Sequence, residues 1–226
     1  MIYLTKHSTQ AAYDAVKDNL AKPQVALTVD NNVVHYQPLT PPTPTAETRV
    51  VAIFNVEDTS EPIQILGTEY TIDEVSSIEI DGVEQLSVVS AYTFSTTGEH
   101  TVKYTLSDPT SIGNEFFMGC YGITSIVIPN SVTSIDMYAF TNCNSLTSVT
   151  IGSGVTSISG CAFETCESLI QIISLATTAP TLGFEVFGYV ASNGTLYVPQ
   201  GSSGYDAWMS NDYGFLGGFG WTMVEQ

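Results

Sequence analysis

The sequence contains few charged residues, and basic residues are the scarcest of them. Charged side chains make up 12% of the 226 residues, and five Lys and Arg stand against 23 Asp and Glu, which gives a formal net charge of −18. A chain of this charge repels phosphate backbones and anionic lipid surfaces, so we do not expect nucleic acid as a partner. We interpret the acidity as an aid to solubility. Ser, Thr and Asn must supply much of the surface, and this composition suits an extracellular, β-rich protein.

The sequence also lacks the motifs that carry most enzyme and metal chemistry. Its histidines, His7, His35 and His100, lie in three separate segments, and no H-E-x-x-H motif, calcium loop or phosphate-binding glycine pattern is present. The serine-nucleophile motifs G-x-S-x-G and S-x-x-K are absent as well. We therefore predict no cofactor, no bound metal and no enzymatic activity. An enzyme acting on polysaccharide, which needs a cleft with paired carboxylates, is the least favoured alternative.

Long hydrophobic runs are missing too. Nowhere do eighteen apolar residues follow one another, so we expect no membrane insertion. The opening residues contain no apolar run of signal-peptide length. We expect either a leader that was removed before this numbering begins or another route out of the cell, for instance as part of a phage particle.

A repeat of 23 residues dominates the second half of the chain. Copies begin at Thr110, Thr133 and Thr156. Self-similarity at such a step predicts a solenoid whose coils share one continuous core. The same residue types recur at five positions: Ile112, Ile135 and Ile158; Phe117, Phe140 and Phe163; Cys120, Cys143 and Cys166; Ile123, Leu146 and Leu169; Ile126, Val149 and Ile172.

The repeat resembles a known family. The pattern T-S-I-x(4)-F-x-x-C-x-x-[IL]-x-x-[IV]-x-[IV] is similar to the BspA-like leucine-rich repeat, which occurs in bacterial surface proteins, notably of the Bacteroides type. The resemblance implies a right-handed solenoid that serves binding or adhesion. The resemblance implies no catalytic residues in this sequence.

One short strand is expected in each coil, because apolar and polar residues alternate near its end. Its outward positions carry hydroxyls, an amide and aliphatic groups but no charge. This face has two interpretations. It is an exposed pleated surface that simply favours β-branched residues, or it is a neutral, ladder-like surface that binds a polar uncharged ligand, such as a glycan, or another sheet. Ile170 also belongs to this face. The candidate binding residues on it are Thr124, Ser125, Val127, Thr147, Ser148, Thr150, Gln171 and Ile173.

The cysteines are predicted to be a buried ladder. Cys120, Cys143 and Cys166 stack on adjacent coils about 4.8 Å apart, whereas a disulfide needs Cβ atoms about 3.8 Å apart and turned toward each other. Thiolates in a row cannot converge tetrahedrally on zinc either. Cys161 is out of phase and reaches Cys166 only if the local turn is tight.

The first half of the chain divides into three parts. Residues 1–37 are predicted to hold a helix over 9–20 and a hairpin whose strands, 25–29 and 33–36, flank a three-residue loop. This opening is similar to N-terminal segments of Bacteroides and phage-associated proteins, which suggests attachment or assembly. A Pro/Thr-rich linker follows at 38–48.

Residues 49–108 show short strand patterns, and Asp81-Gly82 is a strong hairpin turn. The run from Tyr92 to Leu106 resembles the later strands of bacterial immunoglobulin-like domains, so a small β-sandwich is expected here. Residues 109–226 are then the solenoid and its end.

The repeat weakens after the third copy. Residues 177–187 and 195–199 suggest a stretched fourth coil, and the aromatic tail beyond it suggests a cap over the exposed core. The alternative is a platform on which sugar rings stack, with Tyr205, Trp208 and Trp221 as first candidates.

The sequence thus predicts a mainly β fold with a short leucine-rich-repeat solenoid. The leading functional hypothesis is a non-catalytic binding protein of the cell surface or exterior, with a glycan, a host protein or a neighbouring subunit as its partner. The runner-up is a structural or receptor-binding part of a phage tail or similar assembly, and therefore of a virion.

Overall fold

The computed structural model describes residues 25–30, 33–38, 48–67 and 69–226. The chain forms two compact units, Met1–Thr45 and Ala46–Gln226. In the first unit, β1 (Val25–Asp30) and β2 (Val33–Pro38) pair antiparallel. Asp30 pairs with Val33, so two residues separate the strands of the predicted hairpin rather than three. The predicted helix over 9–20 lies outside the described residues, as does most of the predicted linker 38–48.

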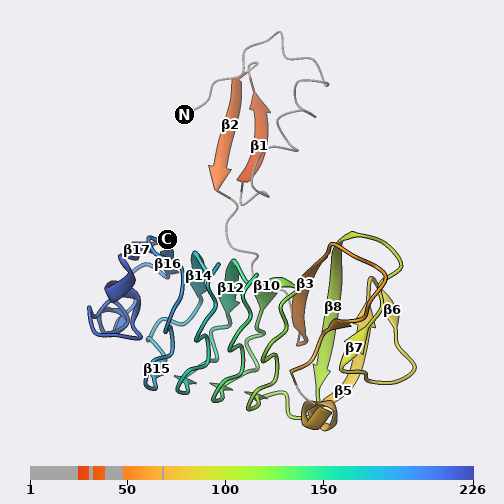
Figure 1. The fold of residues 1–226 in the computed structure, drawn as a ribbon. Coiled ribbons are helices and arrows are strands. Elements are labelled where there is room, and N and C mark those ends of the chain that lie inside the picture. Colours follow the sequence, from red (N-terminus) through yellow and green to blue (C-terminus); the bar gives the residue numbers. More distant parts are fainter. Residues whose placement is uncertain (1–24, 31–32, 39–47, 68) are drawn as a thin grey trace. The chain divides into compact units, whose positions relative to one another are not determined.

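One long sheet runs through the second unit (Figure 1). Its five parallel strands come from successive coils, and four antiparallel strands continue it on the side of β10. In spatial order the strands are β17 (Thr222–Glu225), β16 (Thr195–Val198), β14 (Gln171–Ser174), β12 (Ser148–Ile151), β10 (Ile123–Val127), β3 (Val50–Val56), β8 (Gly98–Leu106), β5 (Val75–Ile80) and β6 (Val83–Glu84).

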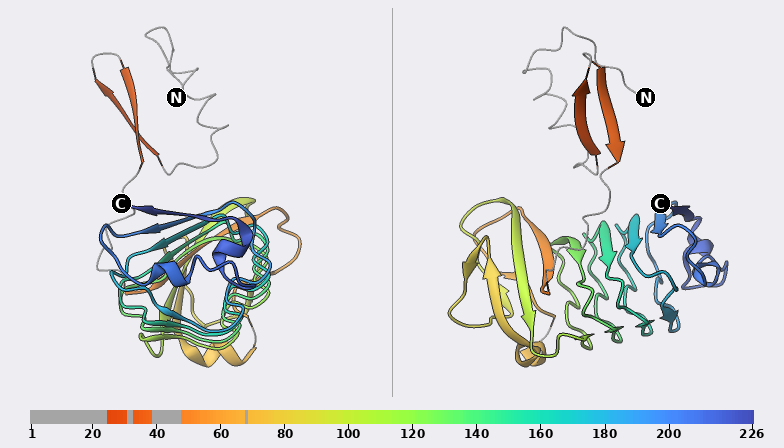
Figure 2. Two further views of the ribbon diagram at one scale, coloured as in Figure 1. Left: turned by 90° about the vertical axis from the view of Figure 1, so that its left-hand side faces the viewer. Right: turned by 180° about the vertical axis from the view of Figure 1, so that it is seen from behind.

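A second, smaller sheet forms the opposite side of the coils (Figure 2). Its four parallel strands are β9 (Ser111–Ile112), β11 (Ser134–Ile135), β13 (Ser157–Ile158) and β15 (Thr181–Leu182). The T-S-I segment that opens each repeat is therefore a strand of its own, in addition to the single strand per coil that the repeat pattern predicts. The predicted mainly β solenoid with 23-residue coils is confirmed. The fourth coil is stretched by one residue, because Ser157 pairs with Thr181.

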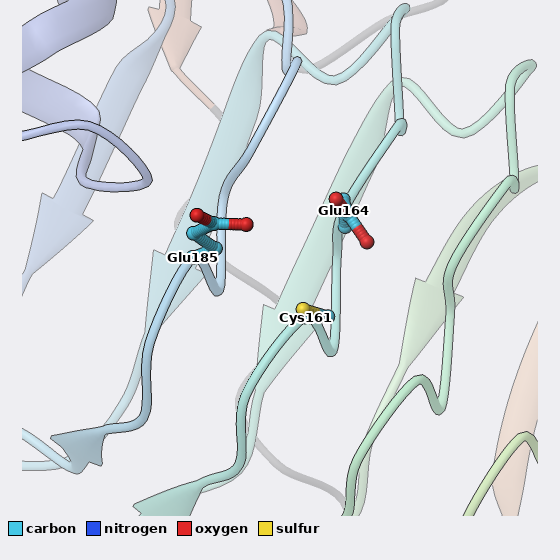
Figure 3. A group of neighbouring side chains, drawn as sticks. All are labelled: Cys161, Glu164 and Glu185. Atoms are coloured by element: carbon cyan, nitrogen blue, oxygen red, sulfur yellow. The ribbon is translucent and has the colours of Figure 1, made fainter.

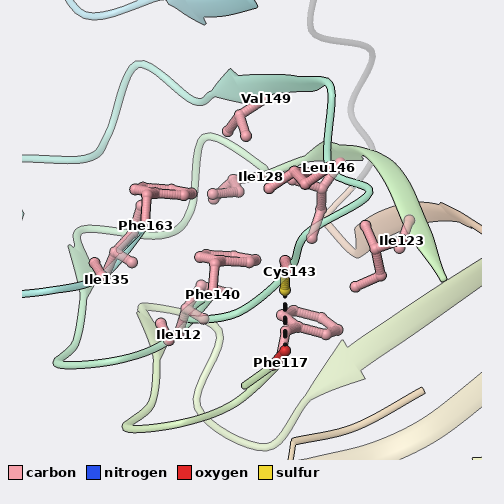
Figure 4. Packing of buried hydrophobic residues seen from close by; sticks show 14 of the residues in the cluster. Ile112, Phe117, Ile123, Ile128, Ile135, Phe140, Cys143, Leu146, Val149 and Phe163 are labelled. Carbon is pink, nitrogen blue, oxygen red and sulfur yellow. Dashed lines mark hydrogen bonds between the residues drawn. The ribbon is translucent and has the colours of Figure 1, made fainter. Parts of the chain in front are cut away.

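An aromatic column fills the centre of the solenoid (Figure 4). The rings of Phe117 and Phe140 stack with centroids 5.2 Å apart, those of Phe140 and Phe163 at 4.8 Å, and those of Phe163 and Phe187 at 5.9 Å. All four phenylalanines are at most 1% exposed. Residues one coil apart thus lie directly above one another, as the repeat predicts.

The cysteines form the predicted buried ladder. The Sγ of Cys143 donates to the carbonyl oxygen of Phe117 at 3.1 Å (Figure 4), and the Sγ of Cys166 donates to that of Phe140 at 3.2 Å. All four cysteines are free, including Cys161, which forms no bridge to Cys166. Burial raises the pKa of Cys143 to about 12 and raises that of Cys120 and Cys166 well above the ordinary value.

Each coil turns at the same place through a left-handed backbone residue. Glu115, Tyr138, Cys161 and Glu185 occupy equivalent positions, with φ between 50° and 60°. This conformation costs a non-glycine residue on the order of 1 kcal/mol. Hydrogen bonds between coils offset that cost, as in the turn where the backbone N–H of Phe140 donates to the carbonyl oxygen of Ala162 at 2.8 Å.

Residues 49–108 extend the solenoid instead of standing apart from it. β3 pairs antiparallel with β10, and the ring of Tyr104 on β8 meets that of Phe117 edge-on, with centroids 5.1 Å apart. Their buried side chains belong to the same core as those of the coils. The remaining elements are η1 (Glu69–Glu74) and a two-stranded sheet of β4 (Ile63–Gln64) and β7 (Ala91–Tyr92).

The expected immunoglobulin-like sandwich is accordingly not confirmed. Among the described residues of this segment, only β4 and β7 form a further sheet, while the other strands belong to the long sheet. The predicted hairpin turn is present: Asp81 and Gly82, with φ of 49° and 82°, join β5 to β6.

The aromatic tail caps the last coil. Tyr205, Trp208 and Trp221 are 2%, 1% and 5% exposed, and each polar atom finds a backbone carbonyl. Two short 3-10 helices, η2 (Tyr205–Ala207) and η3 (Leu216–Phe219), hold these rings in place. The sequence predicted a cap over the core in this segment, and these three rings are buried here. The alternative, a sugar-stacking platform made of these three rings, is wrong because their faces are buried in the core.

Candidate functional site

The outward side of the long sheet aligns six of the eight predicted binding residues in two rows. The inner row is Ser125, Ser148 and Gln171, which pair across β10, β12 and β14, and Thr195 of β16 continues it. Alternate residues of the same strands point into the core, so these side chains face the other way. The row carries hydroxyl and amide groups and no charge.

The outer row is Val127, Thr150 and Ile173, which pair in the same register and continue into Tyr197 and Val224. Val127 is 37% exposed, but Thr150 and Ile173 are only 8% and 6% exposed. The expectation that these two are open to a ligand is therefore corrected. Thr150 pairs with Val127 and Ile173, and Ile173 pairs with Thr150 and Tyr197.

Two of the predicted binding threonines use their hydroxyls in hydrogen bonds to the protein's own backbone. The Oγ1 of Thr147 donates to the carbonyl oxygen of Thr124 at 2.8 Å, and the Oγ1 of Thr124 donates to that of Ile53 at 3.2 Å. The same kind of hydrogen bond occurs beside the small sheet. The Oγ1 of Thr133 donates to the carbonyl oxygen of Thr110, and the Oγ1 of Thr156 donates to that of Thr133. Threonine at these positions joins one coil to the next.

A cleft of about 550 Å³ opens beside the first coil, next to Thr124. The backbone N–H of Asn55, near the end of β3, donates to the carbonyl oxygen of Gly122 at 2.9 Å. A side chain at Gly122 would begin 3.1 Å from Ile63 and 3.3 Å from Phe54, whereas later coils carry serine here. The cleft is lined by Asn55, Glu57, Asp58, Glu61, Pro62, Ile63, Gln64, Tyr121, Gly122, Thr124 and Ser145.

Tyr121 is the conspicuous side chain of this cleft. It is 60% exposed, although most large apolar side chains of the coils are buried. The equivalent positions in the second and third repeats hold Asn144 and Glu167. Tyr121 is not among the binding residues predicted from the sequence, although its departure from the repeat pattern distinguishes it.

A second hollow, of about 390 Å³, is acidic. Four of its lining residues are carboxylates: Asp73, Glu74, Asp108 and Asp136. Burial raises the pKa of Glu74, and the nearby carboxylate of Asp136 raises it further. Among the described residues, no cationic side chain lines this hollow.

Three possible metal ligands meet at the junction of the third and fourth coils (Figure 3). Cys161, Glu164 and Glu185 can each offer one ligand atom, and these atoms lie within 4.8 Å of one another. A thiolate and two carboxylates are donors that zinc accepts. Burial and the two glutamates, however, raise the pKa of the Cys161 thiol to about 11, so the thiol is protonated at neutral pH.

Exposed aromatic side chains also gather near this junction. Tyr189 and Tyr213 are 59% and 51% exposed, and their rings meet edge-on with centroids 5.7 Å apart. Phe184, which is 58% exposed, lies against Gly160. These rings are distinct from the buried rings of Tyr205, Trp208 and Trp221, which were the candidates from the sequence.

His100 makes the ion pair of the antiparallel region that depends most on pH. Its Nδ1 lies 2.6 Å from Oδ2 of Asp81, and its Nε2 lies 2.9 Å from the carbonyl oxygen of Thr96. Burial lowers the pKa of His100, but these hydrogen bonds outweigh it, and the pKa is raised overall. Neither residue lines the cleft beside Tyr121.

The repeats match a known family of repeats. Residues 110–208 match the family model described as "BspA type Leucine rich repeat region", in six copies. No curated protein and no solved structure gives a match to the chain. Within the described residues, no helix has the length and apolar character that a membrane crossing requires. The matched repeats are typical of scaffolds that bind other proteins, and such repeats generally carry no enzymatic activity.

Proposed function

We propose that this leucine-rich-repeat protein is a non-catalytic binding protein that engages a protein partner through the outward side of β10, β12, β14 and β16. The observation that carries the proposal is the uncharged row of Ser125, Ser148, Gln171 and Thr195, repeated in register at strand spacing. The match of the same coils to a repeat family typical of protein-binding scaffolds supports it.

The rigidity of this face favours binding. Its strands are hydrogen-bonded on both sides, and the threonine hydroxyls and the phenylalanine column tie each coil to the next. A partner that docks on such a face orders few side chains, so little of the interaction energy is lost as conformational entropy. Sites built on strands also hold their geometry better than sites built on loops.

A glycan is the second candidate ligand. The hydroxyl and amide groups of the inner row favour it, because they can donate to and accept from sugar hydroxyls. The resemblance of the repeats to those of bacterial surface proteins favours a location at the cell surface or exterior, with a virion as the alternative.

A binding array of extracellular matrix proteins and glycans, probed with the full chain, tests the proposal. Ser148→Arg together with Gln171→Arg places two bulky charged side chains on the inner row. Ser153→Arg together with Thr178→Arg is the matched control, since both residues are exposed and lie outside the rows. We expect a specific array signal that the first pair reduces at least tenfold and the control pair leaves within twofold.

Equal loss from both pairs would mean that the added charge, and not the face, controls binding. A signal that neither pair changes excludes the outward face as the site. An array without any specific signal contradicts the proposal that the chain binds proteins or glycans of this kind.

A further inference from the structure

We infer that the cleft beside Tyr121 binds an arginine or lysine side chain of the protein partner. This inference rests on the proposed function and names the chemistry of the partner. It is carried by three properties of the cleft: an open aromatic ring, a carboxylate wall and the lack of a counter-ion among the described residues.

The aromatic ring stands where a cation can reach it. Tyr121 is 60% exposed at the turn before β10, and it lines the cleft together with residues of the loop that follows β3. Cations are attracted to the face of such a ring within about 6 Å of its centre. Tyrosine at this position is particular to the first coil, since the next two coils carry Asn144 and Glu167.

The carboxylate wall comes from the loop after β3. Glu57, Asp58 and Glu61 all line the cleft and are exposed. Asp58 accepts the backbone N–H of Ser60 at 2.8 Å, a hydrogen bond that lowers its pKa and keeps it ionised. Within the described part of the chain, Glu57 and Glu61 have no side-chain hydrogen bond or ion pair, so their oxygens remain open to a bound cation.

The unit itself supplies no cation for this wall. Residues 46–226 hold 20 of the 23 acidic residues but only two of the five basic ones, so they carry the whole net charge of −18. Those two bases pair elsewhere: Arg49 and Lys103 lie 2.8 Å and 3.2 Å from carboxylate oxygens of Glu79. A basic partner would therefore meet complementary charge, which speeds encounter and selects against acidic competitors.

Polar groups at the rim suit the backbone or side chain that would accompany the cation. The side chains of Asn55 and Ser145 are exposed and, among the described residues, make no hydrogen bond. Gln64 and Thr124 are already engaged, with Gly67 and Ile53 respectively. Because Thr124 lines the cleft and Ser125 begins the inner row, one extended segment can contact both.

Titration of the ¹⁵N-labelled full chain with N-acetyl-arginine amide tests the inference. We expect shifts in the amide signals of Asn55, Tyr121 and Gly122, weaker ones with N-acetyl-lysine amide, and none with N-acetyl-glutamine amide, which has the same backbone but no charge. An acetylated Gly/Ser peptide with one central arginine then provides a dissociation constant. Its affinity should fall as salt rises from low to physiological concentration.

Variants separate the parts of the cleft. Tyr121→Asn, the residue of the second coil, should weaken the arginine peptide about 2- to 30-fold, the range of a cation–π contact, while Tyr121→Phe keeps the ring and stays within twofold. Glu61→Gln should also weaken binding, and Glu84→Gln, an exposed glutamate on β6, should not. Unchanged amide spectra outside the cleft confirm that each variant is folded.

Three results would overturn the inference. They are an arginine titration that leaves the cleft signals unmoved, equal shifts with the glutamine derivative, and a neutral sugar such as chitobiose that shifts these signals where arginine does not. The array variants of the outward face report on the proposed function separately. If a partner no longer binds after Ser148→Arg with Gln171→Arg but binds the Tyr121→Asn variant unchanged, the proposed function stands and the cleft inference fails.

Discussion

The rings of Phe140 and Phe163 stack face to face, with centroids 4.8 Å apart and planes 1° from parallel. Each ring also has a stacked neighbour on its other side, Phe117 or Phe187. A phenylalanine of the column thus belongs as much to the adjacent coils as to its own, and its removal affects three coils together.

Truncation of the column should be strongly destabilising. Phe140→Ala leaves a cavity between two rings, and we expect the free energy of unfolding to fall by about 3–5 kcal/mol. Urea denaturation followed by circular dichroism measures it. Phe184→Ala is the matched control, because that ring is 58% exposed, and its loss should cost less than about 1 kcal/mol. Equal losses would show that the column is not the main source of stability.

The threonine hydroxyls should contribute modestly and additively. Thr147→Val keeps the shape of the side chain but removes the donor to the carbonyl oxygen of Thr124, so we expect a loss of about 0.5–1.5 kcal/mol in the free energy of unfolding. Thr178→Val is the control, since Thr178 is exposed and its hydroxyl has no hydrogen bond among the described residues. If both variants cost the same, β-propensity explains the effect and the hydrogen bond does not.

Much of the solenoid was predictable because the repeat fixes its own register. Once residues 23 apart are placed above one another, the phenylalanine column and the cysteine ladder follow from Phe117 and Cys120 alone. The T-S-I strand was not predictable in this way, since two residues such as Ser111–Ile112 show no alternation. The use of the Thr147 hydroxyl depends on a side-chain rotamer that no pattern reveals.

The extension of the sheet by β3 was beyond sequence reasoning for another reason. Ile126 pairs with Ala52, which lies more than 70 positions earlier in a segment without repeats. Such a pairing has no local signal, so the strand patterns of 49–108 equally suited an independent sandwich. The cleft was missed with it, because its two walls meet only through this pairing.

The pair of His100 and Asp81 should make stability depend on pH. The raised pKa of His100 contributes stability that is fully present below about pH 6.5 and is lost as pH rises through the folded-state value. Burial raises the pKa of Asp81, but the His100 hydrogen bond outweighs it, so that pKa is lowered. The contribution of Asp81 is present above about pH 3.9 and is lost as pH falls through the lowered value.

Asp81→Asn tests this dependence, because asparagine tolerates the positive φ and can still accept the N–H of Thr101. The melting temperature should fall more at pH 6 than at pH 8.5, and an NMR titration should show a lower pKa for His100. Asp108→Asn, at an exposed carboxylate without a histidine partner, should give equal changes at both pH values. An Asp81→Asn effect that is the same at pH 6 and pH 8.5 contradicts the ion pair.

The four thiols should be inert in the folded protein. All are buried, and burial raises the pKa of each, to about 11 for Cys161 and about 12 for Cys143. Little thiolate exists at pH 8, and the thiolate is the reacting species. A disulfide reagent should therefore titrate four thiols in guanidinium chloride and fewer than one in the native protein. Rapid native reaction of one thiol, assigned by mass spectrometry, would contradict this account.

The junction of β3 with β10 gives the solenoid a fixed starting edge. Antiparallel strands supply a finished template on which the first coil can form, and every later coil presents the same kind of edge to the next. An additional 23-residue unit inserted after Val155 would therefore meet matching partners above and below. The length of such a protein can change by internal duplication, while its two ends stay as they are.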